Sequence, residues 1–369
     1  MYSVLITGGA GFIGSHLADE LLVAGHRVSA LDNLDAQVHD GSSRPEYLNP
    51  EVELVRGDVR DAGSVARALE GIDVVYHFAA RVGVGQSMYE LADYQSVNAF
   101  GTGVLLEALL DRPIRRLVVA SSMSVYGEGA YATADGRPCT ARDRTREQLE
   151  RGEWEPSGAN DEALVPVPTP ETKQPSLASI YALGKYDQER MCLIFGSAYG
   201  IPTVALRFFN VYGPRQALSN PYTGVLAIFA SRLLNGRAPL VFEDGQQRRD
   251  FVSVADAARA CRLALERDEA AGEVINVGSG RSVSVLEIFD ELRLALGSDV
   301  EAEVTGKARA GDIRHCFADI GRARALLGFE PRVELHDGIA ELASWLEGQI
   351  AADRVDTAAR ELAARGLTL

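Results

Sequence analysis

The sequence has few of the residues that build metal, disulfide and membrane structures. Its four cysteines are scattered with no short spacing, which excludes a disulfide framework and a zinc knuckle. Its six histidines form no pair at helical spacing, so we expect no metal site. No stretch approaches about 18 consecutive apolar residues, so we expect no membrane span and no membrane partner.

Positive charge is also scarce. The chain carries 37 Lys and Arg against 52 Asp and Glu, a net charge of -15. A nucleic acid would be repelled on average, whereas a small anionic ligand can still bind where a few arginines gather in one cleft. The first residues enter a predicted strand with no basic segment followed by an apolar one, which predicts a cytoplasmic enzyme.

Apolar runs with strand character alternate with amphipathic segments through the first half of the chain. The predicted strands cover residues 2–6, 26–31, 52–55, 73–79, 116–121 and 202–207. This alternation predicts an α/β fold with a doubly wound parallel (Rossmann) sheet. Ligands of such sheets bind outside the carboxyl ends of the strands, so polar residues at those ends are the candidates for a site.

The pattern also suggests how the chain is divided. We expect a Rossmann domain over residues 1–206, and a smaller α/β domain over 207–348 with segments that return to the first. Residues 349–369 are predicted to form a peripheral helix or a tail. Residues 128–175 are rich in Gly, Pro and charged side chains, and form either a polar insertion or lid near the mouth of a site or a surface decoration.

Residues 7–14 read Thr-Gly-Gly-Ala-Gly-Phe-Ile-Gly and directly follow the first predicted strand. Glycine permits the tight strand-to-helix turn and the close approach of the backbone to a pyrophosphate, which the helix N-terminus then binds. The alternative is a turn that is only structural. The predicted dinucleotide contacts are Gly8, Gly11, Phe12, Ile13 and Gly14.

Asp32 closes the second predicted strand. Its carboxylate can accept both hydroxyls of an adenosine ribose and would repel a 2′-phosphate, so NAD is favoured over NADP. The ten residues that follow contain no Arg or Lys to bind such a phosphate. The alternative is a solvated carboxylate at a strand end.

Tyr181 and Lys185 lie four positions apart in a predicted helix and therefore share one face. A tyrosine, with its pKa near 10, becomes a useful base when an ammonium group and a cationic nicotinamide ring favour the phenolate. Ser122 follows the strand at 116–121, and its hydroxyl can bond a substrate oxygen and pass a proton toward Tyr181. The alternatives are a chance spacing and a serine that only satisfies backbone groups.

In this order along the chain, these features resemble the extended short-chain dehydrogenases/reductases, within the NAD-dependent nucleotide-sugar epimerase/dehydratase family. The likeness extends from residue 4 to about residue 345. It implies a catalytic triad of Ser122, Tyr181 and Lys185, the last two also touching NAD, and a homodimer formed through the helices near 97–110 and 181–195. It implies further NAD contacts from Asn33, Asp58, Val59, Phe78, Ala79, Ala80, Asn98, Ser121 and Phe208.

The resemblance also implies where a nucleotide-diphosphate sugar binds. Asn210 and Arg249 match contacts to the diphosphate, Arg309 matches a phosphate contact, and Asp312 matches a contact to the nucleotide ribose. Bidentate arginines suit phosphate oxygens, although each arginine could instead form a surface salt bridge. The full expected substrate set is Ser122, Met123, Ser124, Asn210, Arg215, Val225, Arg249, Arg309 and Asp312.

The residues after Ser122 select among the family's reactions. Met123 and Ser124 stand where 4,6-dehydratases have Asp-Glu, and the Glu of the decarboxylases and the Cys of the 3,5-epimerases are absent as well. A 4-epimerase remains. In that reaction Tyr181, assisted by Ser122, takes the C4 hydroxyl proton while NAD⁺ takes the hydride, and the 4-keto sugar then regains both with the hydride on its other face.

The expected substrate is a dTDP-6-deoxyhexose such as dTDP-L-rhamnose. Ala217 stands where uronic-acid epimerases place an arginine, and residues 216–225 together with the insertion are similar to bacterial dTDP-L-rhamnose 4-epimerases. The alternatives are an epimerase of UDP-hexoses or other nucleotide sugars, a nucleotide-sugar oxidoreductase or dehydratase, and an NAD-binding regulator without activity.

Overall fold

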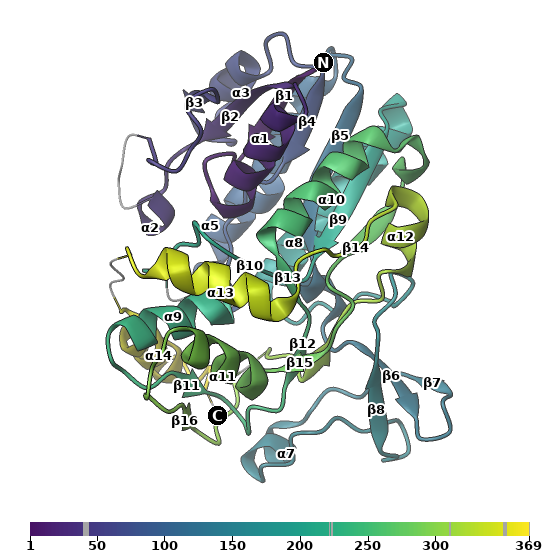
Figure 1. The fold of residues 1–369 in the computed structure, drawn as a ribbon. Coiled ribbons are helices and arrows are strands. Elements are labelled where there is room, and N and C mark those ends of the chain that lie inside the picture. Colours follow the sequence, from purple (N-terminus) through teal and green to yellow (C-terminus); the bar gives the residue numbers. More distant parts are fainter. Residues whose placement is uncertain (40–43, 221, 223, 310, 350–352, 369) are drawn as a thin grey trace.

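The computed structural model describes residues 1–39, 44–220, 222, 224–309, 311–349 and 353–368. Its centre is a parallel sheet of seven strands in the order β14-β9-β5-β4-β1-β2-β3 (Figure 1). The strands are β1 (Ser3–Thr7), β2 (Arg27–Asp32), β3 (Glu53–Arg56), β4 (Val74–His77), β5 (Arg116–Ser122), β9 (Thr203–Phe208) and β14 (Val274–Val277). The predicted doubly wound α/β fold is therefore confirmed.

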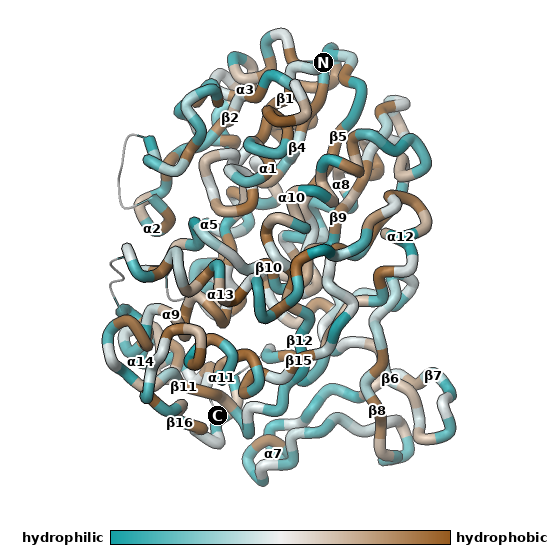
Figure 2. Tube along the Cα trace, viewed as in Figure 1, coloured by the Kyte–Doolittle hydropathy of each residue, from teal (hydrophilic) through white to brown (hydrophobic). Residues whose placement is uncertain are grey.

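Helices cover both faces of the sheet because successive strand residues point to opposite sides. Val4 and Ile6 of β1 pack with α1 (Phe12–Val23), α10 (Val254–Glu266) and α12 (Gly321–Leu327). Leu5 packs on the other face with α3 (Ala62–Ala68), α6 (Gly101–Leu109) and α8 (Ile180–Tyr199). Figure 2 shows apolar stretches on these strands and on the helices that cover them.

Several elements from the second half of the chain belong to this first unit. β14 pairs with β9, and α10 packs against α1. A second unit has a core that contains α9 (Val225–Leu234), α11 (Val285–Ala295) and α13 (Leu335–Leu346). Its short strands are β10 (Asn210–Tyr212), β11 (Leu240–Val241), β12 (Arg248–Arg249), β13 (Phe251–Ser253), β15 (Val283–Ser284), β16 (Glu303–Val304) and β17 (His315–Cys316).

Residues 128–175 form a small antiparallel sheet of their own. Its strands β6 (Ala130–Thr133), β7 (Pro138–Cys139) and β8 (Leu164–Val167) pair in the order β7-β6-β8, and α7 (Arg146–Glu150) lies between β7 and β8 in sequence. Figure 1 shows this insertion at the lower right, projecting away from the large sheet.

The end of the described chain folds back onto the molecule through α14 (Val355–Ala364). Glu361 accepts hydrogen bonds from the hydroxyls of Tyr89 (2.9 Å) and Tyr222 (3.2 Å), and Asp353 pairs with Arg232 of α9 at 3.2 Å. Residues 350–352 and 369 of the predicted tail lie outside the described residues. The remaining short helices are α2 (Ala36–His39), α4 (Val84–Ser87), α5 (Leu91–Gln95), η1 (Ser96–Phe100), η2 (Met123–Tyr126) and η3 (Asp268–Ala270). Across the described ranges, we find no helix with the length and apolar character to cross a membrane.

Candidate active site

A cleft of about 540 Å³ lies at the carboxyl ends of the central strands. Both units contribute to it: the glycine turn and the ends of β2, β4, β5 and β9 on one side, and residues of the second unit such as Val225, Arg249 and Phe251 on the other. This volume is within the usual range for small-ligand sites. The topology therefore gathers strand-end residues that are far apart in sequence into one cavity.

The glycine turn lies at the floor of this cleft, where backbone passes very close to backbone. Gly8 has φ +71°, and a Cβ placed there would lie 2.9 Å from the amide nitrogen of Ala79. Gly11 is the N-cap of α1 and offers no side-chain cap, so the first N–H groups of the helix are available to an anion. Gly8, Gly11, Phe12, Ile13 and Gly14 all line the cleft. These features fit the pyrophosphate of NAD.

We expect Gly8→Ala to lose most of its bound NAD and to unfold at a lower temperature, because the new methyl group meets the Ala79 backbone in a strained conformation. Gly25→Ala is the matched control, since Gly25 has a similar φ of +81° with nothing within 4 Å of the added Cβ. The strain alone costs about 1 kcal/mol or more in both variants. The measurements are NAD released per protein chain and Tm; equal NAD content in the two variants would contradict the steric argument.

The end of the cleft around Asp32, where we expect the adenosine of NAD, is acidic. Asp32 is buried and accepts the backbone N–H of Ala10 (3.1 Å) and of Leu34 (2.9 Å). Asn33 donates to Asp58 at 3.2 Å, and the hydrogen bond from Arg60 lowers the pKa of Asp58 to about 2. Asp32, Asn33, Asp58 and Val59 line the cleft.

Tertiary folding brings two arginines near Asp32 that the local sequence does not reveal. Arg60 pairs with Asp58 and Asp93, and Arg81 pairs with Asp35, Glu90 and Asp93. Both therefore have carboxylate partners, and neither supplies a free cation for a 2′-phosphate. The predicted preference for NAD over NADP therefore still holds with Arg60 and Arg81 in the cleft.

The three residues of the expected triad meet in the cleft. Ser122 ends β5, and its oxygen accepts from the backbone N–H (3.1 Å) and the hydroxyl (3.0 Å) of Ser124. Its own proton is then available to Tyr181. Burial raises the pKa of Tyr181, and the hydrogen bond from Ser122 acts in the opposite direction. Lys185 is buried, which lowers its pKa to about 7, and its Nζ donates to Gln188 Oε1 at 2.6 Å.

The remaining predicted cofactor residues differ in their placement. Phe78, Ala79, Ala80, Ser121 and Phe208 line the cleft. The Ser121 hydroxyl nevertheless donates to buried Glu189 at 2.6 Å and not toward the cavity. Asn98 is absent from the lining: it is fully buried and holds the backbone of Arg81 by accepting its N–H (2.7 Å) and donating to its carbonyl (3.1 Å). Asn98 thus acts on the cleft only through the loop after β4.

On the substrate side, Ser122, Met123, Ser124, Asn210, Val225, Arg249 and Asp312 line the cleft. Asn210 donates to the carbonyl of Asp250 at 3.0 Å. Arg249 donates to backbone carbonyls, those of Arg248 (2.9 Å), Arg314 (3.0 Å) and Ile313. Since these partners carry no charge, the positive charge of Arg249 remains available to an anionic ligand.

Two of the expected substrate arginines are paired with carboxylates. Arg215 pairs with Asp19 at 2.8 Å, and Arg309 forms a bidentate pair with Asp312 (3.0 and 3.1 Å) and lies over the ring of Phe242. Neither belongs to the cleft lining, so for Arg309 the structure shows the salt bridge that was the alternative. Pro221 and Thr223 of the segment 216–225, and Ala310 beside Arg309, lie outside the described residues.

The comparisons with known proteins agree with this geometry. Residues 4–148 and 157–278 match the model of the NAD dependent epimerase/dehydratase family. The chain belongs to this family. It is 36% identical to a dTDP-L-rhamnose 4-epimerase of Burkholderia thailandensis, over 94% of this chain and 95% of that protein, and 32% identical to a putative UDP-glucose 4-epimerase of Methanocaldococcus jannaschii, over 93% and 98%.

Solved structures of the family have the same fold. A UDP-glucose 4-epimerase from Thermotoga maritima with UDP-glucose aligns with a TM-score of 0.77 at 32% identity, covering 94% of this chain and 98% of that one. One from Thermus thermophilus in complex with NAD gives 0.75 at 30% identity, covering 94% and 100%. The predicted family, the dependence on NAD and the enzymatic nature of the chain are confirmed.

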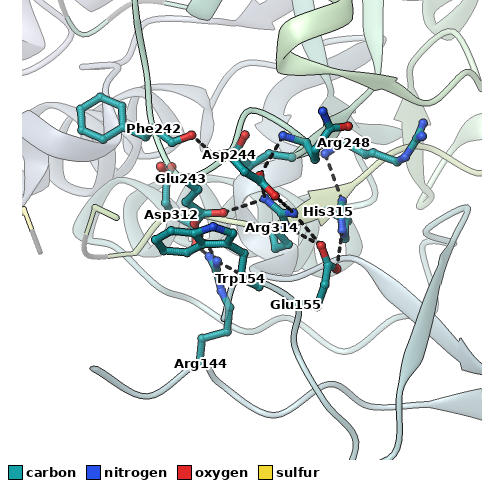
Figure 3. A network of polar contacts seen from close by, with 12 residues as sticks. Arg144, Trp154, Glu155, Phe242, Glu243, Asp244, Arg248, Asp312, Arg314 and His315 are labelled. Carbon is teal, nitrogen blue, oxygen red and sulfur yellow. Dashed lines mark hydrogen bonds and ion pairs between the residues drawn. The ribbon is translucent and has the colours of Figure 1, made fainter. Parts of the chain in front are cut away.

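In this family member, the insertion touches the cleft only indirectly. No described residue of 128–175 lines the cavity. Instead, Arg144 donates to the carbonyl of cleft residue Asp312 at 2.9 Å, and Glu155 pairs with buried Arg314 at 2.6 Å and with His315 at 2.9 Å (Figure 3). The insertion therefore braces the segment that carries Asp312, and its described part does not form the cavity wall expected of a lid.

Buried His77 makes the free energy of unfolding of this protein depend on pH. Burial lowers the pKa of His77 from 6.5 to about 3. The His77 side chain therefore stays neutral in the folded protein at pH values where the unfolded chain would bind a proton there. Stability is therefore full above pH 6.5 and falls as the pH drops toward 3, by up to about 1.4 kcal/mol per pH unit. We expect His77→Gln to flatten this acid slope in urea unfolding between pH 7 and 4. His336→Gln, at an exposed site, should keep the wild-type slope.

The sequence reasoning missed Gln188 and His77, which lie directly beneath Lys185. A usable signal existed for Gln188, because a residue three positions after Lys185 shares its helix face. No such signal existed for His77, since its contact with α8 joins residues 111 positions apart.

Proposed function

We propose that this chain is a nucleotide-sugar 4-epimerase acting on a dTDP-6-deoxyhexose such as dTDP-L-rhamnose. The observation that carries the proposal is the meeting of Ser122, Tyr181 and Lys185 in one cleft, where Met123 and Ser124 follow the serine. A dehydratase needs a second acid and base at those two positions, and neither side chain can serve. Of the three triad residues, Tyr181 is then the one that accepts the proton from the C4 hydroxyl of the sugar.

NAD, when bound, accepts a hydride from C4 of the sugar and returns it to the opposite face. Tyr181 takes the C4 hydroxyl proton as the alcohol becomes a ketone and gives it back when the alcohol re-forms. Ser122 donates to the phenolate oxygen or the sugar oxygen, and the charge of Lys185 favours the phenolate. Arg249 and Asn210 retain the diphosphate, so that the keto sugar can turn over without leaving.

The preference for a 6-deoxy sugar is supported by the apolar Met123 in the lining and by the 36% identity to the Burkholderia enzyme. The test is incubation of purified protein with dTDP-L-rhamnose, without added NAD or reductant, followed by NMR of the sugar. We expect a mixture of the substrate and its C4 epimer. Faster turnover of UDP-glucose would reassign the substrate to the UDP-hexoses, and a stable keto product would contradict epimerisation.

We further propose that the protein is a homodimer through the outer faces of η1, α6 and α8. These elements pack together, and Phe100 (60% exposed) and Ile194 (59% exposed) are large apolar side chains left in solvent on them. We expect Phe100→Asp combined with Ile194→Asp to sediment as a monomer. Val23→Asp on α1, where Val23 is 88% exposed, is the control and should leave the dimer intact. A wild-type protein that sediments as a monomer would rule out the interface.

A further inference from the structure

A row of buried polar groups lies beneath the catalytic lysine. Gln188 is fully buried one turn after Lys185 on α8, and its Oε1 accepts from Lys185 Nζ at 2.6 Å. Its Nε2 donates to the carbonyl of Ala79 (3.1 Å) and to Thr102 Oγ1 (3.2 Å), and lies 3.1 Å from His77 Nε2. One amide thus joins the lysine to the loop after β4 and to α6.

One assignment of donors and acceptors satisfies the hydroxyls of both Thr7 and Thr102. The hydroxyl of Thr102 donates to the carbonyl of Asn98 at 2.6 Å, so its oxygen must accept from His77 Nε2 at 2.8 Å. The Thr7 oxygen accepts the N–H groups of Phe78 and Ala79, each at 3.2 Å, so its proton goes to His77 Nδ1 at 2.8 Å. His77 is therefore neutral, with its proton on Nε2.

Lys185 and the carbonyl of Ala79 fix the orientation of the Gln188 amide. A reversed amide would place its NH₂ group 2.6 Å from the Lys185 ammonium and its oxygen 3.1 Å from the carbonyl oxygen of Ala79. Both contacts would be repulsive. Gln188 can therefore present only its oxygen to Lys185.

The other ionisable groups around Lys185 do not neutralise it. Glu189 is committed to Arg207 (2.7 Å) and Ser121, burial raises the pKa of Cys192 to about 12, and burial lowers that of His77 to about 3. Tyr181, the remaining ionisable group on this face, is the residue on which the lysine acts. In the part of the chain that the structure describes, Gln188 is the one recorded acceptor for Lys185 Nζ, and it carries no charge.

We propose that Gln188 is a positioning residue: its fixed neutral amide holds Lys185 at the cleft floor, links it through Thr102, His77 and Thr7 to the glycine turn, and leaves its positive charge uncompensated toward Tyr181. The proposal rests on the proposed function, in which that charge favours the phenolate. A carboxylate in this place would hold the ammonium equally well but cancel its field. Gln188 therefore orients the Lys185 ammonium group without neutralising its charge.

The test measures the protonation of Lys185 without any sugar. Holoenzyme is labelled with a trace of acetic anhydride across a pH series, and the extent of acetylation of the Lys185 peptide is read by mass spectrometry. We expect Gln188→Glu to move the labelling midpoint up by about one pH unit or more, and Gln188→Leu to move it down. Gln247→Leu, at a buried glutamine of the second unit, is the control and should not move it. An unchanged midpoint in both Gln188 variants would show that Gln188 only packs.

Kinetics supply the second readout. With dTDP-L-rhamnose, we expect Gln188→Glu to shift the acid limb of the kcat profile to higher pH, and Gln188→Leu to lower kcat about tenfold or more with little change in KM. Proportional losses in all variants at every pH would overturn the positioning role. The two proposals fail separately: shifted labelling without epimerisation of any nucleotide sugar refutes the function alone, and normal turnover with unshifted labelling refutes the role of Gln188 alone.

Discussion

Replacing Tyr181 with phenylalanine is expected to lower kcat by about a thousandfold, within the usual range for loss of a general acid–base group. In the proposed mechanism the phenolic oxygen takes the C4 proton, and the substitution removes this oxygen while Ser122 and Lys185 stay in the cleft lining. The ring itself remains, so the packing of α8 and the binding of NAD should persist. The measurements are single-turnover epimerisation of dTDP-L-rhamnose and NAD content per chain.

The matched control is Tyr186→Phe on the same helix. Tyr186 is partly buried against the core, and it is not part of the cleft lining. We expect wild-type kcat from this variant. A Tyr181→Phe enzyme within tenfold of wild type would mean that another group takes the proton, and the mechanism proposed for this site would be wrong.

Replacing Glu189 with alanine should have the largest effect on stability. Glu189 is fully buried and receives two hydrogen bonds from Arg207, at 2.9 and 2.7 Å, in addition to that from Ser121. Its removal leaves the Arg207 guanidinium buried without its counter-charge, which costs about 3 to 5 kcal/mol. Urea unfolding of the NAD-saturated protein measures the loss.

Two further variants separate this explanation from simple loss of a side chain. Glu330→Ala removes an exposed partner of Arg324 (2.9 Å apart) and should cost less than about 1 kcal/mol. Replacing Glu189 with leucine and Arg207 with methionine together should cost less than Glu189→Ala alone, because no unpaired charge is then left in the interior. A double variant less stable than the single one would show that the pair stabilises the fold in its own right.

The parts of the site that depend on local backbone conformation could be predicted from the sequence. The glycine turn, Asp32 and the spacing of Tyr181 and Lys185 each depend on residues within one strand-turn-helix unit or one helical turn. The topology of parallel sheets then requires the ends of β1, β2, β4 and β5 to meet at one edge, which is why the cleft lies where the pattern placed it.

Side-chain partners across the fold could not be read in the same way. The resemblance placed Asn98, Arg215 and Arg309 at ligands, whereas in the structure Asn98 holds the backbone of Arg81, Arg215 pairs with Asp19, and Arg309 pairs with Asp312. Each polar side chain takes whichever partner the packing brings within about 3 Å, and the chain does not encode that partner by spacing.

The sequence by itself determined the α/β class, the glycine turn and the helix that carries Tyr181 and Lys185, because strand alternation, glycine conformation and helical periodicity act over a few residues. Only the tertiary structure decided how the catalytic lysine is held and what the insertion does. Gln188, His77 and Thr7 come from three separate elements, and Glu155 reaches Arg314 from 159 positions away. Contacts of that kind form only when the sheet and the two units pack together, because a polar group that is buried without a hydrogen-bond partner destabilises the fold.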